Sequence, residues 1–152
     1  MSDSGNPYTR VQIKFHLSCT LAAMLSLAGC TSSPGKPQNQ HVLPECGWLP
    51  NCINSQSGRG VQASTPISAS AEQWQKLKAW IAQQEDWAIT VNDSNFMQAI
   101  VKTPIMRFRD DVQLLFLPDK QMIQVRSSSR LGLSDLDTNA RRVETLRDQL
   151  MP

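Results

Sequence analysis

Carboxylate, guanidinium and hydroxyl side chains that could bind or transform a ligand are concentrated in the last third of the chain. Arginines beside serine hydroxyls can hold a phosphate, a carboxylate or a sugar acid, and Asp–Arg pairs can equally tie a fold together. Two interpretations stay open: a structural polar cluster, or an anion-binding site with Arg126 and Arg130 as its clamp. The residues singled out are Asp110, Asp111, Arg126, Ser128, Arg130, Asp135, Asn139 and Arg142.

Catalysis by these groups is a third alternative, as a small periplasmic hydrolase or transferase that uses Asp and Arg side chains. Asp110 and Asp111 are adjacent, so on a strand they point to opposite faces and cannot form a facing acid and base pair. His41, the histidine nearest to the cluster in sequence, lies in a linker and offers no base for a serine. We expect no catalytic residues, no cofactor and a non-catalytic function.

The first 29 residues have the organisation of a signal peptide. Basic Arg10 and Lys14 precede an apolar run over residues 17–28, which is shorter than the ~20 residues of a transmembrane helix. Residues 27–30 read Leu-Ala-Gly-Cys and resemble the lipobox of bacterial lipoproteins. The resemblance implies acylation of Cys30 after cleavage before it. The alternatives are a signal anchor, or a chance cysteine beside a secretion signal.

An acylated Cys30 would hold the protein on a membrane, because two or more acyl chains anchor stably. Thr31 follows the cysteine, and the absence of Asp there resembles lipoproteins sorted to the outer membrane, facing the periplasm. Residues 30–45 form the lipidated cysteine and a tether rich in proline and polar residues, with a root-mean-square reach of roughly 20 Å. A single globular domain is expected over residues 46–152.

Cys46 and Cys52 are the thiols that remain after the signal peptide and Cys30 are set aside. An even pair in an exported, turn-rich segment predicts a disulfide bond. A redox-active pair is the weaker alternative, since five residues separate the two cysteines. Two cysteines do not complete a tetrahedral set, so we expect no metal site.

The apolar patterns of the domain predict an α+β fold. Helical spacing marks residues 71–84 after a capping box at Ser70, and again residues 139–150 behind Asp137 or Thr138. Alternating or extended segments predict strands at residues 87–91, 96–102, 106–116 and 121–129. We expect a four-stranded antiparallel sheet with both helices on one face, the other face in water, and an N-terminal disulfide loop.

A turn at residues 119 and 120 sets the register of the last two predicted strands. It places Phe116 opposite Ile123, and Asp111 opposite Ser128. Asp111 then lies diagonal to both Arg126 and Arg130, within reach of their long side chains. On the other strand face, Met106 and Phe108 are expected to line the core together with Val112, Leu114 and Phe116.

Three stretches, residues 50–55, 109–112 and 125–136, resemble the domain-of-unknown-function 1499 family. Asn139, Arg142, Val143 and Glu144 fit the continuation of its last motif, whereas Asp137 stands at the usual glycine and Ala140 at the usual arginine. The resemblance covers about residues 46–150. It implies an envelope-associated or exported domain of undetermined activity.

Charge and composition limit the partners. The chain has 15 Lys plus Arg against 13 Asp plus Glu, with 18% charged residues and no long basic run, which argues against nucleic acid as a partner. The remaining partners are the membrane, through the lipid on Cys30, and an envelope protein or anionic ligand. The expected function is a non-catalytic envelope lipoprotein that binds a protein partner or an anionic envelope component.

Overall fold

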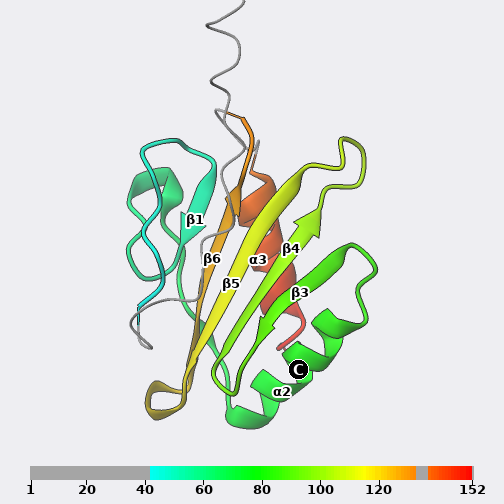
Figure 1. The fold of residues 1–152 in the computed structure, drawn as a ribbon. Coiled ribbons are helices and arrows are strands. Elements are labelled where there is room, and N and C mark those ends of the chain that lie inside the picture. Colours follow the sequence, from blue (N-terminus) through cyan, green and yellow to red (C-terminus); the bar gives the residue numbers. More distant parts are fainter. Residues whose placement is uncertain (1–41, 133–136, 152) are drawn as a thin grey trace, which may run out of the picture. The chain divides into compact units, whose positions relative to one another are not determined.

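The computed structural model describes residues 42–132 and 137–151 (Figure 1). The signal peptide, Cys30, most of the predicted tether and Asp135 lie outside these residues. In chain order the elements are β1 (Cys52–Asn54), η2 (Gly60–Gln62), β2 (Ile67–Ser68), α2 (Ala71–Ala82), β3 (Trp87–Asn92), β4 (Phe96–Lys102), β5 (Arg109–Leu117), η3 (Pro118–Lys120), β6 (Met122–Ser129) and α3 (Thr138–Asp148).

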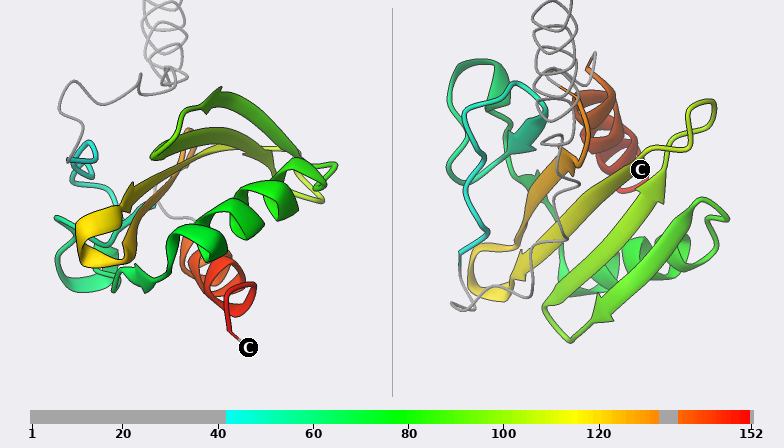
Figure 2. Two further views of the ribbon diagram at one scale, coloured as in Figure 1. Left: turned by 90° about the horizontal axis from the view of Figure 1, so that it is seen from below. Right: turned by 45° about the horizontal axis from the view of Figure 1, so that its top comes forward.

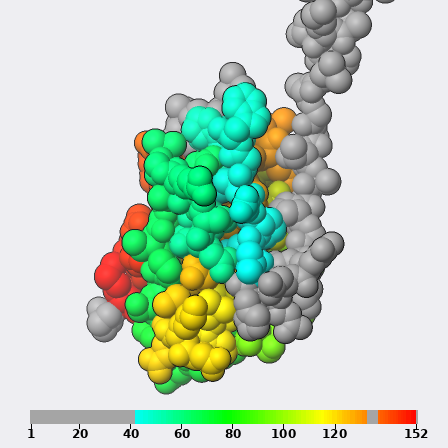
Figure 3. All heavy atoms as spheres, turned by 90° about the vertical axis from the view of Figure 1, so that its left-hand side faces the viewer, coloured from blue at the N-terminus to red at the C-terminus, as the bar shows by residue number. Residues whose placement is uncertain are grey.

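The strands form one antiparallel sheet in the order β1-β6-β5-β4-β3, with β2 also paired to β6. The antiparallel α+β fold is confirmed, but the sheet has six strands and not four. The two missed strands have three and two residues, which is too short for a period-two pattern to reveal. Segments 42–69 cover the β6 edge of the sheet beside the β5–β6 turn (Figure 3).

Helix α2 begins at the predicted capping box. The Ser70 hydroxyl accepts from the Gln73 backbone N–H at 3.2 Å, and the Gln73 side chain accepts from the Ser70 N–H at 2.9 Å. Trp74, Leu77 and Ile81 form its buried stripe. The helix ends two residues earlier than predicted, because the chain must turn before Trp87 pairs with Val101 at the start of β3.

Both helices lie on the same side of the sheet (Figure 2, left). They enclose the main core with the inward residues of β4, β5 and β6, and that core is Ile53, Ile67, Ala69, Trp74, Leu77, Ile81, Met97, Val101, Val112, Leu114, Phe116, Ile123, Val125, Val143, Leu146 and Leu150. Helix α3 ends before Leu150, which is nevertheless buried. Asp137 occupies the cap position of α3 with φ of 63° and makes no side-chain cap hydrogen bond.

The predicted register of β5 and β6 is confirmed at Phe116 opposite Ile123 and at Asp111 opposite Ser128. Leu117 pairs with Met122, and the 3-10 turn of Pro118–Lys120 replaces the predicted two-residue turn. The register is unchanged because both connections join the same residue pairs, counted from the turn outward.

The placement of Met106 and Phe108 in the core is wrong, since both side chains are exposed. Strand β5 begins only at Arg109, because Thr103 closes a turn before it. The Thr103 carbonyl accepts from the Arg107 N–H at 3.1 Å, and its hydroxyl accepts from the Phe108 N–H at 2.9 Å. The alternating pattern therefore continues through residues that are not in a strand.

The sheet face away from the helices was expected to face water, and this is also wrong. Leu43, Phe96, Leu115 and Leu117 form a second buried cluster there. Leu43 falls in the segment predicted as tether, yet its backbone N–H donates to Gln56 Oε1 at 2.8 Å. The contacts of Leu43 therefore extend the folded domain to the start of the described residues.

Candidate functional site

A buried network links β5, β6 and α3 on the helix side of the sheet. Arg142 Nη2 donates to Asp110 Oδ2 at 2.6 Å, and its Nη1 donates to Ser127 Oγ at 2.8 Å and to Asn139 Oδ1 at 2.6 Å. The Ser127 hydroxyl donates to Asn139 Oδ1 at 2.6 Å, and Asn139 Nδ2 donates to the Asn51 carbonyl at 2.9 Å. One carboxylate and one guanidinium balance here, and the network joins the last helix to the sheet. Asp110 Oδ1 is buried without a hydrogen-bond partner among the described residues, but its charge is met by Arg142.

A second pair lies on the opposite face of the sheet. Arg130 holds Asp111 in a bidentate ion pair, with Nε to Oδ2 at 2.9 Å and Nη2 to Oδ1 at 2.8 Å. The predicted diagonal contact between Asp111 and Arg130 is confirmed. Such a fork is directional and charge-assisted, and it fixes the end of β6 against the start of β5.

Arg126 behaves differently from Arg130, although the register puts both diagonal to Asp111. Its Nη1 donates to Ser128 Oγ at 2.9 Å, and among the described residues its Nε is buried without a hydrogen-bond partner. Arg126 is 8% exposed and belongs to no ion pair of the described residues. Burial lowers the pKa of its guanidinium from the ordinary value, and the charge of Asp111 opposes this shift.

Arg126 is part of a row of polar side chains that runs across four strands. The register places Gln98 of β4, Gln113 of β5, Arg126 of β6 and Asn54 of β1 side by side, and all four are buried. Gln113 Nε2 donates to Gln98 Oε1 at 2.9 Å. Neither Gln98 nor Asn54 was expected from the sequence to belong to a polar cluster. The period-two pattern of β4 could have revealed Gln98, whereas the three residues of β1 carry too weak a pattern to reveal Asn54.

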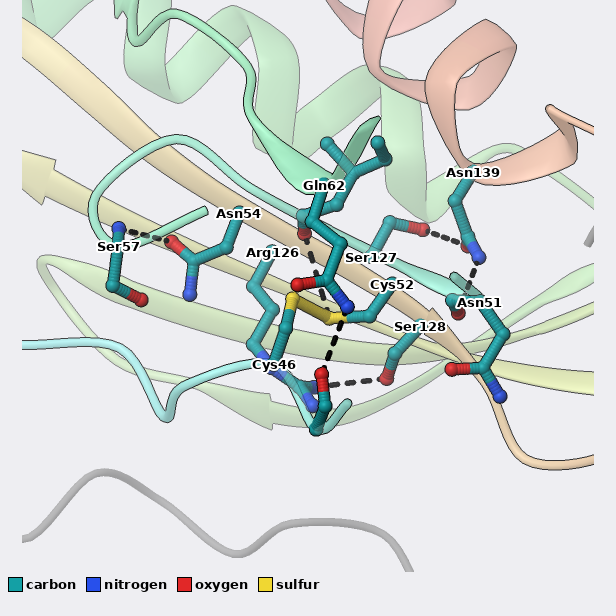
Figure 4. The surroundings of a disulfide bond; sticks show 12 residues. Cys46, Asn51, Cys52, Asn54, Ser57, Gln62, Arg126, Ser127, Ser128 and Asn139 are labelled. Atoms are coloured by element: carbon teal, nitrogen blue, oxygen red, sulfur yellow. Dashed lines mark hydrogen bonds between the residues drawn. A yellow bond between two sulfur atoms is a disulfide. The ribbon is translucent and has the colours of Figure 1, made fainter. Parts of the chain in front are cut away.

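The predicted disulfide is confirmed and lies next to this row (Figure 4). Cys46 and Cys52 are bonded, and Cys52 pairs with Ser128 across β1 and β6. Gln62 Nε2 donates to the carbonyls of Gly47 at 2.8 Å and Leu49 at 2.7 Å, which holds the loop closed from its other side. The disulfide loop is thus fastened beside the Ser128 and Arg126 pair.

The structure divides the predicted polar cluster into two groups. Asp110, Asn139 and Arg142 meet on the helix side, and Asp111, Arg126, Ser128 and Arg130 lie on the other side. Asp135 and Cys30 lie outside the described residues. Within the described part of the chain, no three His, Cys, Asp or Glu residues are grouped as metal ligands. No helix in that same part is long and apolar enough to cross a membrane.

Fold and site define a small α/β domain with an antiparallel sheet, two helices, a disulfide-closed loop and buried Asp–Arg pairs. The family described as protein of unknown function, DUF1499, matches over residues 42–150, and the chain belongs to this family. The match begins at Val42, the first residue that the structure describes. No curated protein and no solved structure matches the chain.

Proposed function

We propose that this protein is a non-catalytic envelope lipoprotein whose domain binds an oxyanion, such as a phosphate, a carboxylate or a sugar acid of an envelope component. Arg126 is the principal donor, with the Ser128 hydroxyl beside it and the guanidinium of Arg130 completing the positive field. Arginine suits this role because its planar fork matches oxyanion geometry and keeps its charge when desolvated.

The observation that carries the proposal is the buried Nε of Arg126, which has no hydrogen-bond partner among residues 42–132 and 137–151. Leaving a buried donor unsatisfied has a cost in folding free energy, and a buried charge without a counter-charge costs more. Asp111 is held by the fork of Arg130, whereas Arg126 belongs to no ion pair among the described residues. A bound oxyanion would satisfy both the donor and the charge.

No observation favours the hydrolase or transferase alternative. The two carboxylates that such an enzyme would use lie on opposite sides of the sheet. Asp110 forms an ion pair with Arg142, and Asp111 forms one with Arg130. The two carboxylates therefore do not face a common position where a substrate could lie between them. We therefore assign Asp110 and Arg142 to the fold and keep the ligand role for Arg126.

Inorganic phosphate is the probe for this site. The melting temperature of the purified acylated protein in detergent should rise with phosphate at constant ionic strength, by the equivalent of about 2.7 kcal/mol when phosphate reaches a hundredfold excess over Kd. Arg126→Met should abolish the rise, whereas Arg59→Met removes an exposed arginine with the same charge change and should keep it. An equal rise in both variants, or none in the wild type, would overturn the proposed site.

Lipid anchoring at Cys30 and the position in the outer membrane, facing the periplasm, form the second half of the proposal. The Leu-Ala-Gly-Cys sequence at residues 27–30 supports it. Mass analysis of protein from its native host should find residue 30 at the amino terminus with acyl chains, and Cys30→Ser should abolish the modification and release the chain from membranes. An unmodified Cys30 thiol within an intact leader would contradict it.

A further inference from the structure

Large apolar side chains are exposed at one end of the sheet, which we call the apolar end. Trp48 of the disulfide loop is 88% exposed and Ile105 of the β4–β5 turn is 90% exposed. Met106, Phe108 and Leu131 are also exposed there. Exposed apolar residues that occur singly are normal, but several on neighbouring loop tips mark an interaction site.

Strand pairing places these residues together. Lys102 opposite Arg109 is the last pair of β4 and β5, so residues 103–108 form the turn at this end. The Arg130 N–H donates to the Arg109 carbonyl at 3.4 Å, and Asn51 Nδ2 donates to the Gly132 carbonyl at 3.1 Å. Leu131 therefore lies between the β4–β5 turn and the disulfide loop, and the tips span about three strand spacings, roughly 14 Å.

The two outer tips are held in place by hydrogen bonds and by the disulfide. Thr103 closes the β4–β5 turn, and Arg107 adopts φ of 54° within it, which presents Ile105 and Met106 outward. The disulfide and the two hydrogen bonds from Gln62 hold the loop that carries Trp48. Rigid apolar tips lose little conformational entropy when they become buried.

Basic side chains surround the apolar end. Arg107, Arg109 and Arg141 are exposed and Lys102 is half-buried. Asp86 forms an exposed ion pair with Arg107 at 3.4 Å, and screening makes such a pair weak. Apolar tips, a tryptophan and flanking arginines are the combination that lies well at the boundary between headgroups and acyl chains of an anionic bilayer.

We propose that the apolar end docks onto the surface of an anionic bilayer, with Trp48, Ile105 and Met106 inserted at the level of the lipid headgroups. Docking at this end orients the domain relative to the membrane. The docking proposal depends on the proposed function in one respect: the length of the tether matters only if Cys30 is acylated.

The tether is long enough for this orientation. Leu43 packs with Phe96 and Leu117, at the end of the sheet opposite to the apolar end. In the docked orientation Leu43 would lie about the length of β5 from the membrane, and the nine residues of that strand span roughly 30 Å. The twelve steps from Cys30 to Val42 extend to about 40 Å at most, so an intact tether suffices and a much shortened one does not.

Quenching of Trp48 fluorescence by brominated lipids tests the docking. The full chain is placed in vesicles of phosphatidylethanolamine and phosphatidylglycerol that carry bromine near the headgroup end of the acyl chains. The Trp48 signal is the difference between the wild type and Trp48→Phe, a change at an exposed position. We expect this signal to be quenched, and the quenching to be lost in Ile105→Asp and after deletion of residues 32–37.

Met151→Asp is the matched control, since Met151 is an exposed apolar residue beyond α3 and should keep the quenching. Trp48 that stays accessible to iodide and unquenched by lipid would overturn the docking. Trp48 that becomes protected from iodide without lipid quenching would also overturn it, in favour of a second copy or another protein. If Cys30 is acylated and phosphate still raises the melting temperature, such results leave the proposed function standing.

Discussion

The carboxylates of Asp110 and Asp111 are neighbours in sequence, yet they serve opposite faces of strand β5. Asp110 forms an ion pair with Arg142 of helix α3, with Oδ2 and Nη2 2.6 Å apart. Asp111 forms an ion pair with Arg130, which directly follows β6, with Oδ1 and Nη2 2.8 Å apart. The motif therefore fastens the start of β5 twice, once to the last helix and once to the last strand. Two ion pairs from adjacent residues thus hold this corner of the sheet on both of its faces.

Removing either partner of the helix-side pair should destabilise the domain strongly. Asp110→Asn or Arg142→Met leaves a buried group without its counter-charge, and we expect a loss of about 3 to 5 kcal/mol in the free energy of unfolding. Urea denaturation followed by circular dichroism measures this loss. The double variant Asp110→Asn with Arg142→Met should lose less than the sum of the two single changes, and strict additivity would show that the two residues do not interact.

Arg126 and Arg130 should differ in their effect on stability, although both are arginines on one face of β6. Arg126→Met keeps the apolar stem and removes a buried guanidinium that has one hydrogen bond, to Ser128, and an Nε without a partner among the described residues. The free energy of unfolding should therefore fall by less than about 1 kcal/mol or rise. Arg130→Met leaves the buried Asp111 carboxylate without its fork and should cost about 3 kcal/mol. Thermal unfolding in phosphate-free buffer compares them, and equal losses would show that Arg126 supports the fold as Arg130 does.

The disulfide should contribute moderately to stability. Closing the short Cys46–Cys52 loop contributes about 2 kcal/mol by the chain-entropy estimate. Cys46→Ser should therefore lower the free energy of unfolding by about this amount, with the core left folded. Unfolding of the wild type with and without reductant provides the comparison, and the serine variant should show no effect of reductant.

Two glycines near this loop offer a sharp steric test. A Cβ at Gly58 would collide with the backbone carbonyl oxygens of Asn54 and Gln62, whereas a Cβ at Gly47 would meet nothing within 4 Å. Gly58→Ala should cost more than about 3 kcal/mol, because backbone cannot move aside as a side chain can. Gly47→Ala should change stability by less than about 1 kcal/mol, and a comparable loss in both variants would contradict the close approach at Gly58.

Much of the architecture was readable from local patterns. The capping box at Ser70 and Gln73, the stripe of Trp74, Leu77 and Ile81, and the pairing of Phe116 with Ile123 follow from residue type and spacing. The Cys46–Cys52 bond follows from the number of cysteines in this part of the chain and from the turn-rich segment between them. These features are set by contacts within one element or across one turn, so the sequence near them contains the needed information.

Other features depended on segments that meet only in the folded chain. By register, Asp111 is equally placed for Arg126 and Arg130, since each lies two residues from Ser128 on β6. The fold gives the bidentate contact to Arg130 and places Arg126 between Gln113 and Asn54, a neighbour supplied by the three-residue β1. Leu43, from a segment that composition predicts as tether, covers part of the sheet face expected to be wet.

The sequence by itself determined the helices, the long strands with their register, the disulfide and the residues of the polar cluster. Only the tertiary structure decided which arginine forms an ion pair with each carboxylate, how β1 extends the polar row beside β6, and where the apolar loop tips lie together. The physical reason is that local periodicity shows which side of a helix or strand is apolar. The partner of a buried charge depends instead on which groups are desolvated together when distant segments pack, and no local pattern contains that information.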